Sequence, residues 1–83
     1  SFMKVETETG SIYEIDDTRK RIRRISGTTV PTPRQGEDGQ WKDFHSILNN
    51  EDNSMYIVWK VDYVDEKPIF RATLTSRIIK ILS

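Results

Sequence analysis

Short runs in which apolar and polar residues alternate dominate the chain, and turn-forming residues separate them. The clearest run is residues 55–63, where four large apolar side chains take alternate positions: Ile57, Trp59, Val61 and Tyr63. Successive side chains of a strand point to opposite faces, so these four share one face, which we expect to line the core. No apolar stripe at helical spacing extends over three turns. The pattern predicts a β-strand protein.

Several other segments combine β-favouring residue types with flanking turn signals, namely residues 4–9, 11–16, 21–26, 69–75 and 77–82. Residues 41–48 fit either a strand or one short helix, and we favour the strand. Six or seven short antiparallel strands in one chain predict an all-β fold, either a small barrel or a strongly bent sandwich.

One long polar loop is expected at about residues 27–40. This stretch holds three of the four glycines and two of the three prolines. Long irregular loops are uncommon in compact domains, and many of them are functional.

The length of 83 residues fits a single domain spanning residues 1–83. Folding of so short a chain hides only about 60% of the surface that the unfolded chain exposes, so we expect subunits to associate into a homo-oligomer. Ser1 and Phe2 precede Met3 and resemble a remnant of cloning, so we expect Met3 to be the native start.

Composition argues against several kinds of site. The chain has no cysteine and one histidine, His45, which rules out disulfides and thiolate zinc sites, and no metal site or cofactor is expected. A lone histidine beside Asp43 and Ser46 rarely forms a catalytic arrangement, so we expect no catalytic residues. No apolar run is long enough to span a membrane, and no signal peptide is evident. A cytoplasmic protein is the expectation.

Charge sums to zero but is unevenly distributed, because five of the 13 basic residues lie within residues 19–24. Such a cluster can create a local positive patch despite a neutral total. Two interpretations stay open. These side chains either form the solvated face of an amphipathic strand, balanced by the acidic segment 37–66, or they bind an anion.

The anion-binding interpretation combines four arginines with one amide and one indole: Arg21, Arg23, Arg24, Arg34, Gln35 and Trp41. Guanidinium groups hold phosphate or carboxylate in a bidentate fork, and an indole offers a flat surface on which a base can stack. Trp41 could equally be an aromatic that anchors the core or the loop.

Three segments carry a family resemblance: residues 10–16, residues 21–24 and residues 34–41, together with Val58-Trp59 and Leu74-Thr75-Ser76. They resemble short, mostly uncharacterised proteins encoded by bacteriophages and prophages. The resemblance implies a phage accessory protein in the cytoplasm of an infected bacterial host, similar in kind to counter-defence proteins. It carries no assigned site residues.

The resulting hypothesis is a non-catalytic binding protein that sequesters a small anionic, nucleotide-type ligand. One alternative is a stoichiometric inhibitor that docks on a host protein. A weak nucleic-acid binder is less expected, because the net charge is zero. No membrane partner is expected.

Overall fold

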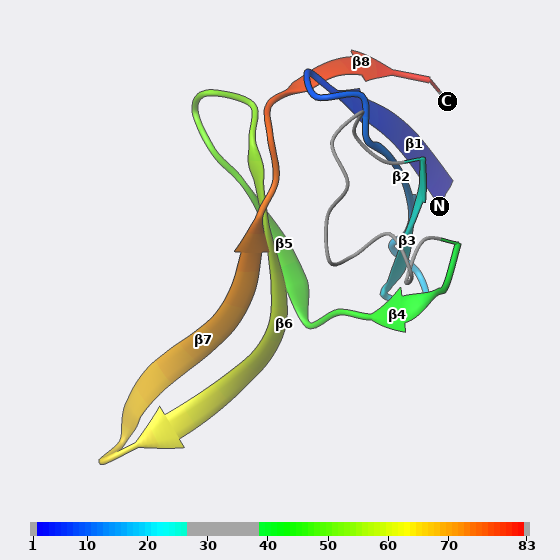
Figure 1. The fold of residues 1–83 in the computed structure, drawn as a ribbon. Coiled ribbons are helices and arrows are strands. Elements are labelled where there is room, and N and C mark those ends of the chain that lie inside the picture. The colour runs from blue at the N-terminus through cyan, green and yellow to red at the C-terminus, as the bar shows by residue number, and fades with distance from the viewer. Residues whose placement is uncertain (1, 27–38, 83) are drawn as a thin grey trace.

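The computed structural model describes residues 2–26 and 39–82, and every regular element in this part of the chain is a strand (Figure 1). The eight strands are β1 (Phe2–Thr7), β2 (Ile12–Asp16), β3 (Arg21–Ser26), β4 (Lys42–Asp43), β5 (Ser46–Asn49), β6 (Met55–Val64), β7 (Lys67–Leu74) and β8 (Ile78–Ile81). The all-β prediction is confirmed, with one strand more than expected because segment 41–48 forms two strands. Most of the expected long loop lies outside the described residues.

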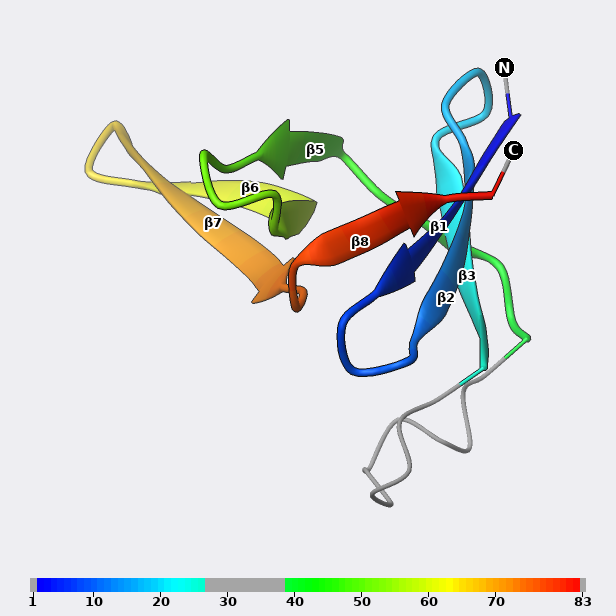
Figure 2. The ribbon, with the colours of Figure 1, turned by 90° about the horizontal axis from the view of Figure 1, so that it is seen from above.

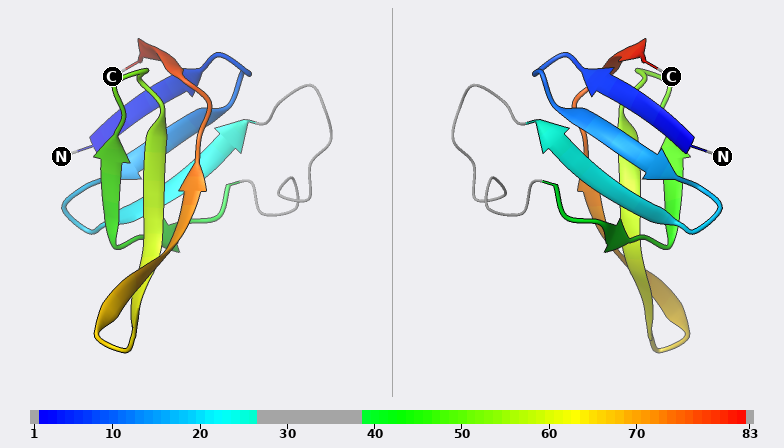
Figure 3. Two further views of the ribbon diagram at one scale, coloured as in Figure 1. Left: turned by 90° about the vertical axis from the view of Figure 1, so that its left-hand side faces the viewer. Right: turned by 90° about the vertical axis from the view of Figure 1, so that its right-hand side faces the viewer.

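Two antiparallel sheets make up the fold. The first has the order β4-β3-β2-β1-β8 and the second the order β5-β6-β7. Figures 2 and 3 show the three-stranded sheet crossing one face of the five-stranded sheet. As described, the sheets do not close into a barrel, so the bent sandwich is the closer of the two predicted architectures.

The core lies between the two sheets. It consists of one apolar cluster drawn from both sheets and from the segment between β4 and β5: Val5, Tyr13, Ile15, Ile22, Phe44, Met55 and Ile57. Val5, Tyr13 and Ile15 belong to neighbouring strands, and Val5 lies directly opposite Tyr13. Their alternation with charged residues such as Lys4 and Glu14 produces the buried face of the first sheet.

A bulge at Trp59 corrects one prediction about the core. Ile57 is buried and Trp59 packs against the core cluster, but Tyr63 is 71% exposed. The register between β6 and β7 shifts between Val58 and Lys60, which inserts Trp59 as an extra residue and interrupts the alternation. The strand then continues beyond the core, so Val61 and Tyr63 do not line it.

The distal half of β6 and β7 forms a hairpin that projects from the rest of the described chain (Figure 3). Its two-residue turn, Asp65-Glu66, has positive φ at both positions, 52° and 66°. Two successive positive φ values are typical of the tight turn whose twist matches that of paired strands. The hairpin is therefore closed by local geometry, although within residues 2–26 and 39–82 no other element packs against its tip (Figure 3).

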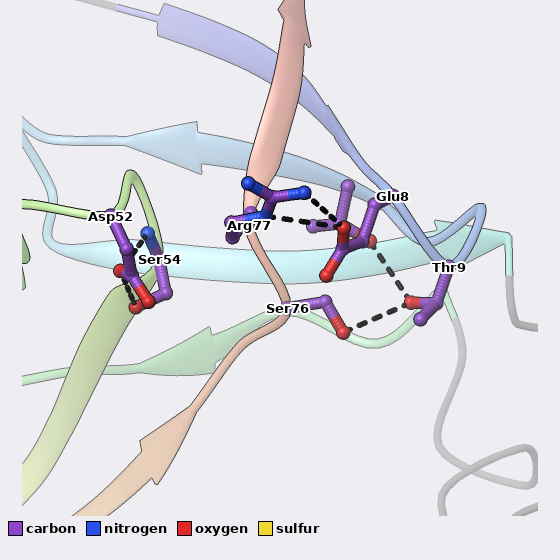
Figure 4. A network of polar contacts seen from close by, with 7 residues as sticks. Glu8, Thr9, Asp52, Ser54, Ser76 and Arg77 are labelled. Atoms are coloured by element: carbon purple, nitrogen blue, oxygen red, sulfur yellow. Dashed lines mark hydrogen bonds and ion pairs between the residues drawn. The ribbon is translucent and has the colours of Figure 1, made fainter.

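The link between β7 and β8 joins the two sheets through polar contacts (Figure 4). Arg77 donates to Glu8 Oε2 with its Nη2, at 2.9 Å, and Ser76 Oγ accepts from Thr9 Oγ1 at 3.2 Å. The guanidinium of Arg77 has a raised pKa because of this hydrogen bond and the charge of Glu8. In the adjoining β5–β6 turn, Ser54 donates to Asp52 from both its hydroxyl and its backbone N–H.

Candidate anion-binding site

Strand β3 places two of the predicted arginines together on the outer face of the five-stranded sheet. Arg21 and Arg23 alternate with Ile22, which is buried in the core. Successive residues of a strand face opposite ways, so Arg21 and Arg23 point away from the core. Arg24 lies opposite Tyr13 on the side of Ile22, and this alternation separates it from the other two.

Trp41 lies against both outward-facing arginines. The Cζ atoms of Arg21 and Arg23 are 5.2 Å and 4.7 Å from the centroid of its ring. Both distances fall within the range of a cation–π interaction. Trp41 precedes β4, which pairs with β3, so strand pairing brings the indole to the arginines. We call Arg21, Arg23 and Trp41 the Arg–Trp cluster.

Four residues that were not predicted surround the cluster: Glu14 and Phe2, and also Asp16 and Asp43, which lie directly opposite Arg21 on strands β2 and β4. Arg23 donates to Glu14 Oε1 from Nε at 2.7 Å, and its Nη2 is 2.6 Å from the same oxygen. Phe2 meets Trp41 edge to face, with ring centroids 6.2 Å apart. Glu14 was predictable in principle, since a hairpin turn at residues 17–20 sets it opposite Arg23. Phe2 was missed because it was expected to be a cloning remnant.

Arg21 differs from Arg23 in its hydrogen bonding. Its Nε atom is buried and meets no hydrogen-bond acceptor within the described residues. A buried donor without an acceptor costs about 1–3 kcal/mol, because it has lost its water and gained nothing in exchange. The cluster therefore contains one guanidinium donor whose hydrogen-bonding capacity is unused.

The remaining candidates are placed elsewhere. Arg34 and Gln35 lie outside the described residues, so their predicted role in the site stays a prediction. His45 is exposed, and its Nδ1 is 3.1 Å from Oγ of the adjacent Ser46. Across residues 2–26 and 39–82, no group of three or more His, Asp or Glu side chains is arranged to hold a metal ion.

Comparison of the chain with protein-family models, with curated proteins and with solved structures found no match. The resemblance to phage proteins accordingly stays a prediction. No helix long and apolar enough to cross a membrane occurs in the described part of the chain. Arguments about function rest on the geometry of the cluster itself.

Proposed function

We propose that the protein is a non-catalytic binding protein that captures a small anion of nucleotide type at the Arg–Trp cluster. The observation that carries this proposal is the pair of guanidinium groups, those of Arg21 and Arg23, that lie 5.2 Å and 4.7 Å from the centroid of the Trp41 ring on the outer face of the sheet. A phosphate or carboxylate oxygen is the acceptor that a guanidinium group binds best, since its planar donors match the two oxygens.

The balance of charges in the cluster favours a ligand with a single phosphate group. Glu14 offsets the charge of Arg23 through their ion pair, and Asp16 and Asp43 lie directly opposite Arg21 on the neighbouring strands, so the cluster offers no run of unpaired basic side chains. Binding of a nucleic-acid backbone normally uses several unpaired basic side chains along the chain of phosphates. A mononucleotide or another small anion suits this site better.

Aromatic surface beside the guanidinium groups supports a ligand that also has a flat ring. Trp41 lies on the same face of the sheet as the guanidinium groups of Arg21 and Arg23. A nucleotide combines a phosphate with a base, and stacking of a base on an aromatic side chain contributes about 1–3 kcal/mol. The phosphate would meet Arg21 while the base covers part of the indole.

The proposed cellular role is sequestration. A protein that binds a nucleotide signal without converting it lowers the free concentration of that signal in proportion to the amount of protein. This role would suit a phage accessory protein that counters a host defence, as the family resemblance implies.

Isothermal titration calorimetry with AMP, ADP and cyclic nucleotides tests the proposal. Loss of one charge-assisted hydrogen bond should weaken binding about tenfold or more in Arg21→Gln. Arg19→Gln removes the same charge from the exposed β2–β3 turn and should change affinity less than about twofold. Absence of binding by the wild type, or equal losses in the two variants, would refute the proposal. Recovery of intact nucleotide from the heated complex separates capture from turnover.

A further inference from the structure

The projecting β6–β7 hairpin has one apolar and one charged face. Directly opposed residues share a face, and Val61 faces Phe70 while Tyr63 faces Pro68. These four residues form what we call the arm face. Tyr63 is 71% exposed and Phe70 59% exposed, so the arm face meets little of the described part of the chain.

The opposite face of the same hairpin is satisfied by its own ion pairs. Asp62 lies 3.4 Å from Lys60 Nζ and 3.7 Å from Arg71 Nε. The arm face is therefore the more apolar of the two faces, although Val64 and Ile69 are exposed on the face that carries the ion pairs.

A groove of about 450 Å³ lies at the other end of the sandwich, between β8 and β6. Its walls are largely apolar and include Met3, Met55 and Ile81, with Lys80 as a charged member. Ile79 and Ile81 are 59% and 68% exposed, and both line the groove. A protruding apolar surface and a recessed one therefore occur on the same chain.

We infer that the arm face of one copy docks in the groove of a second copy, and that the second arm returns the contact. Reciprocal docking about a two-fold axis uses each arm and each groove once and leaves none over. Acidic and basic side chains occur at both surfaces, so charge does not oppose this arrangement. The tip of the arm carries Asp65, Glu66 and Lys67, and the groove carries Lys80, which lies opposite Glu6 on β1.

The available area distinguishes this arrangement from simple stacking of two arms. A buried aromatic side chain covers roughly 150–250 Å², so the exposed parts of Tyr63 and Phe70 offer on the order of 250 Å². The exposed parts of Ile79 and Ile81 add on the order of 100 Å². Arm and groove together thus offer on the order of 350 Å² of apolar surface. Because about 60% of an interface is apolar, this corresponds to about 600 Å² of total interface area per copy.

That area gives about 1,200 Å² for the dimer, which is the lower limit for a specific interface. Stacking of the arms alone would reach only about 800 Å², the size of a crystal-packing contact. Docking of arm in groove is the arrangement that can hold two copies together, and we expect a reversible dimer at micromolar concentration.

Sedimentation velocity over the micromolar range tests the inference, with three lysine variants of exposed residues. Phe70→Lys charges the arm face and Ile81→Lys charges the groove, and each should leave a monomer of 9.7 kDa. Ile69→Lys is the matched control, because it changes the neighbouring residue on the charged face, opposite Asp62. It should dimerise as the wild type does. Circular dichroism confirms that each variant is folded.

A mixing experiment adds a stricter criterion. Phe70→Lys retains an intact groove and Ile81→Lys an intact arm, but an equimolar mixture can restore only one of the two contacts, about 600 Å² in total, so it should associate far more weakly than the wild type. A wild type that stays monomeric overturns the inference, as does an Ile81→Lys variant that dimerises normally or an Ile69→Lys variant that does not. Nucleotide binding at the Arg–Trp cluster should be the same in all three variants, so the inference stands or falls independently of the proposed function.

Discussion

Arg23 and Glu14 form an ion pair whose two members differ in exposure. The distance between Arg23 Nη2 and Glu14 Oε1 is 2.6 Å, and the side chain of Arg23 is 33% exposed whereas that of Glu14 is 9% exposed. Water can therefore solvate the arginine if its partner is removed, but it can hardly reach the carboxylate.

This difference predicts unequal effects of removing the two partners. Arg23→Gln leaves a carboxylate buried without its cation and should lower the free energy of unfolding by about 2–3 kcal/mol. Glu14→Gln leaves a partly solvated guanidinium and should cost about 1 kcal/mol. Urea unfolding of both variants measures the difference. Equal losses would show that the exposure of the two side chains does not govern the energetics of the pair.

The bulge residue Trp59 is held by one side-chain hydrogen bond, from its Nε1 to Oγ1 of Thr73 at 2.9 Å. Thr73→Val preserves the shape of the side chain but removes this acceptor. We expect a loss of about 1–2 kcal/mol in the free energy of unfolding, because the indole N–H is left without a partner. Thr73→Ser keeps the hydroxyl and should lose less. A larger loss in the serine variant would indicate that packing of the methyl group matters more than the hydrogen bond.

Hydrogen bonds from Ser54 lower the pKa of Asp52 below its ordinary range, the hydroxyl contributing most and the backbone N–H next. The folded state thus favours the ionised carboxylate. The stabilisation is fully present above the ordinary carboxyl pKa of about 4 and is lost as the pH falls through the lowered pKa.

Asp52→Asn should accordingly be less stable than the wild type at neutral pH, and the difference should shrink as the pH falls below about 4. Thermal unfolding of the wild type and of Asp52→Asn between neutral pH and pH 3 measures this difference in stability. Ser54→Ala removes the hydroxyl that donates to Asp52. The stability of this variant should therefore also depend less on acid pH than that of the wild type. A difference between wild type and Asp52→Asn that is constant with pH would exclude the linkage.

The burial of Ile57 in the core predicts that its truncation destabilises the protein more than truncation of an exposed residue on the neighbouring strand. Ile57 is 1% exposed and lies between the two sheets, so Ile57→Ala should cost about 2–5 kcal/mol in the free energy of unfolding. Leu48, on the neighbouring strand β5, is 53% exposed, and Leu48→Ala should cost less than about 1 kcal/mol. Guanidinium unfolding measures both. Similar losses would contradict the assignment of the core.

Local pattern was enough to predict most strands, because alternation and turn residues are properties of adjacent positions. The β2–β3 hairpin shows this well, since Asp16-Asp17-Thr18 marks its turn and both strands alternate. The bulge at Trp59 was not predictable, because nothing in residues 55–63 distinguishes a regular strand from one that admits an extra residue. The same bulge determines which residues leave the core for the arm face.

The candidate site was predicted in part. Residue chemistry singled out Arg21, Arg23 and Trp41, and pairing of β3 with β4 brings them together. Their grouping with Arg24 did not take into account that neighbouring residues of a strand face opposite ways. The ion pair between Glu14 and Arg23 was missed because the two residues are neighbours only across paired strands. The order of residues in the sequence does not show this until the register of the strands is known.

The first and last strands of the described chain are neighbours, since β1 pairs with β8 and the backbone N–H of Leu82 donates to the carbonyl of Lys4 at 2.7 Å. The chain forms the three-stranded sheet before β8 returns to the first one. During synthesis, β1 emerges from the ribosome long before its partner and must keep an open edge until residues 78–81 follow. Unpaired edges invite pairing with other chains, so rapid release of the nascent polypeptide, or protection of its early strands by a chaperone, would decide how much protein reaches the native state.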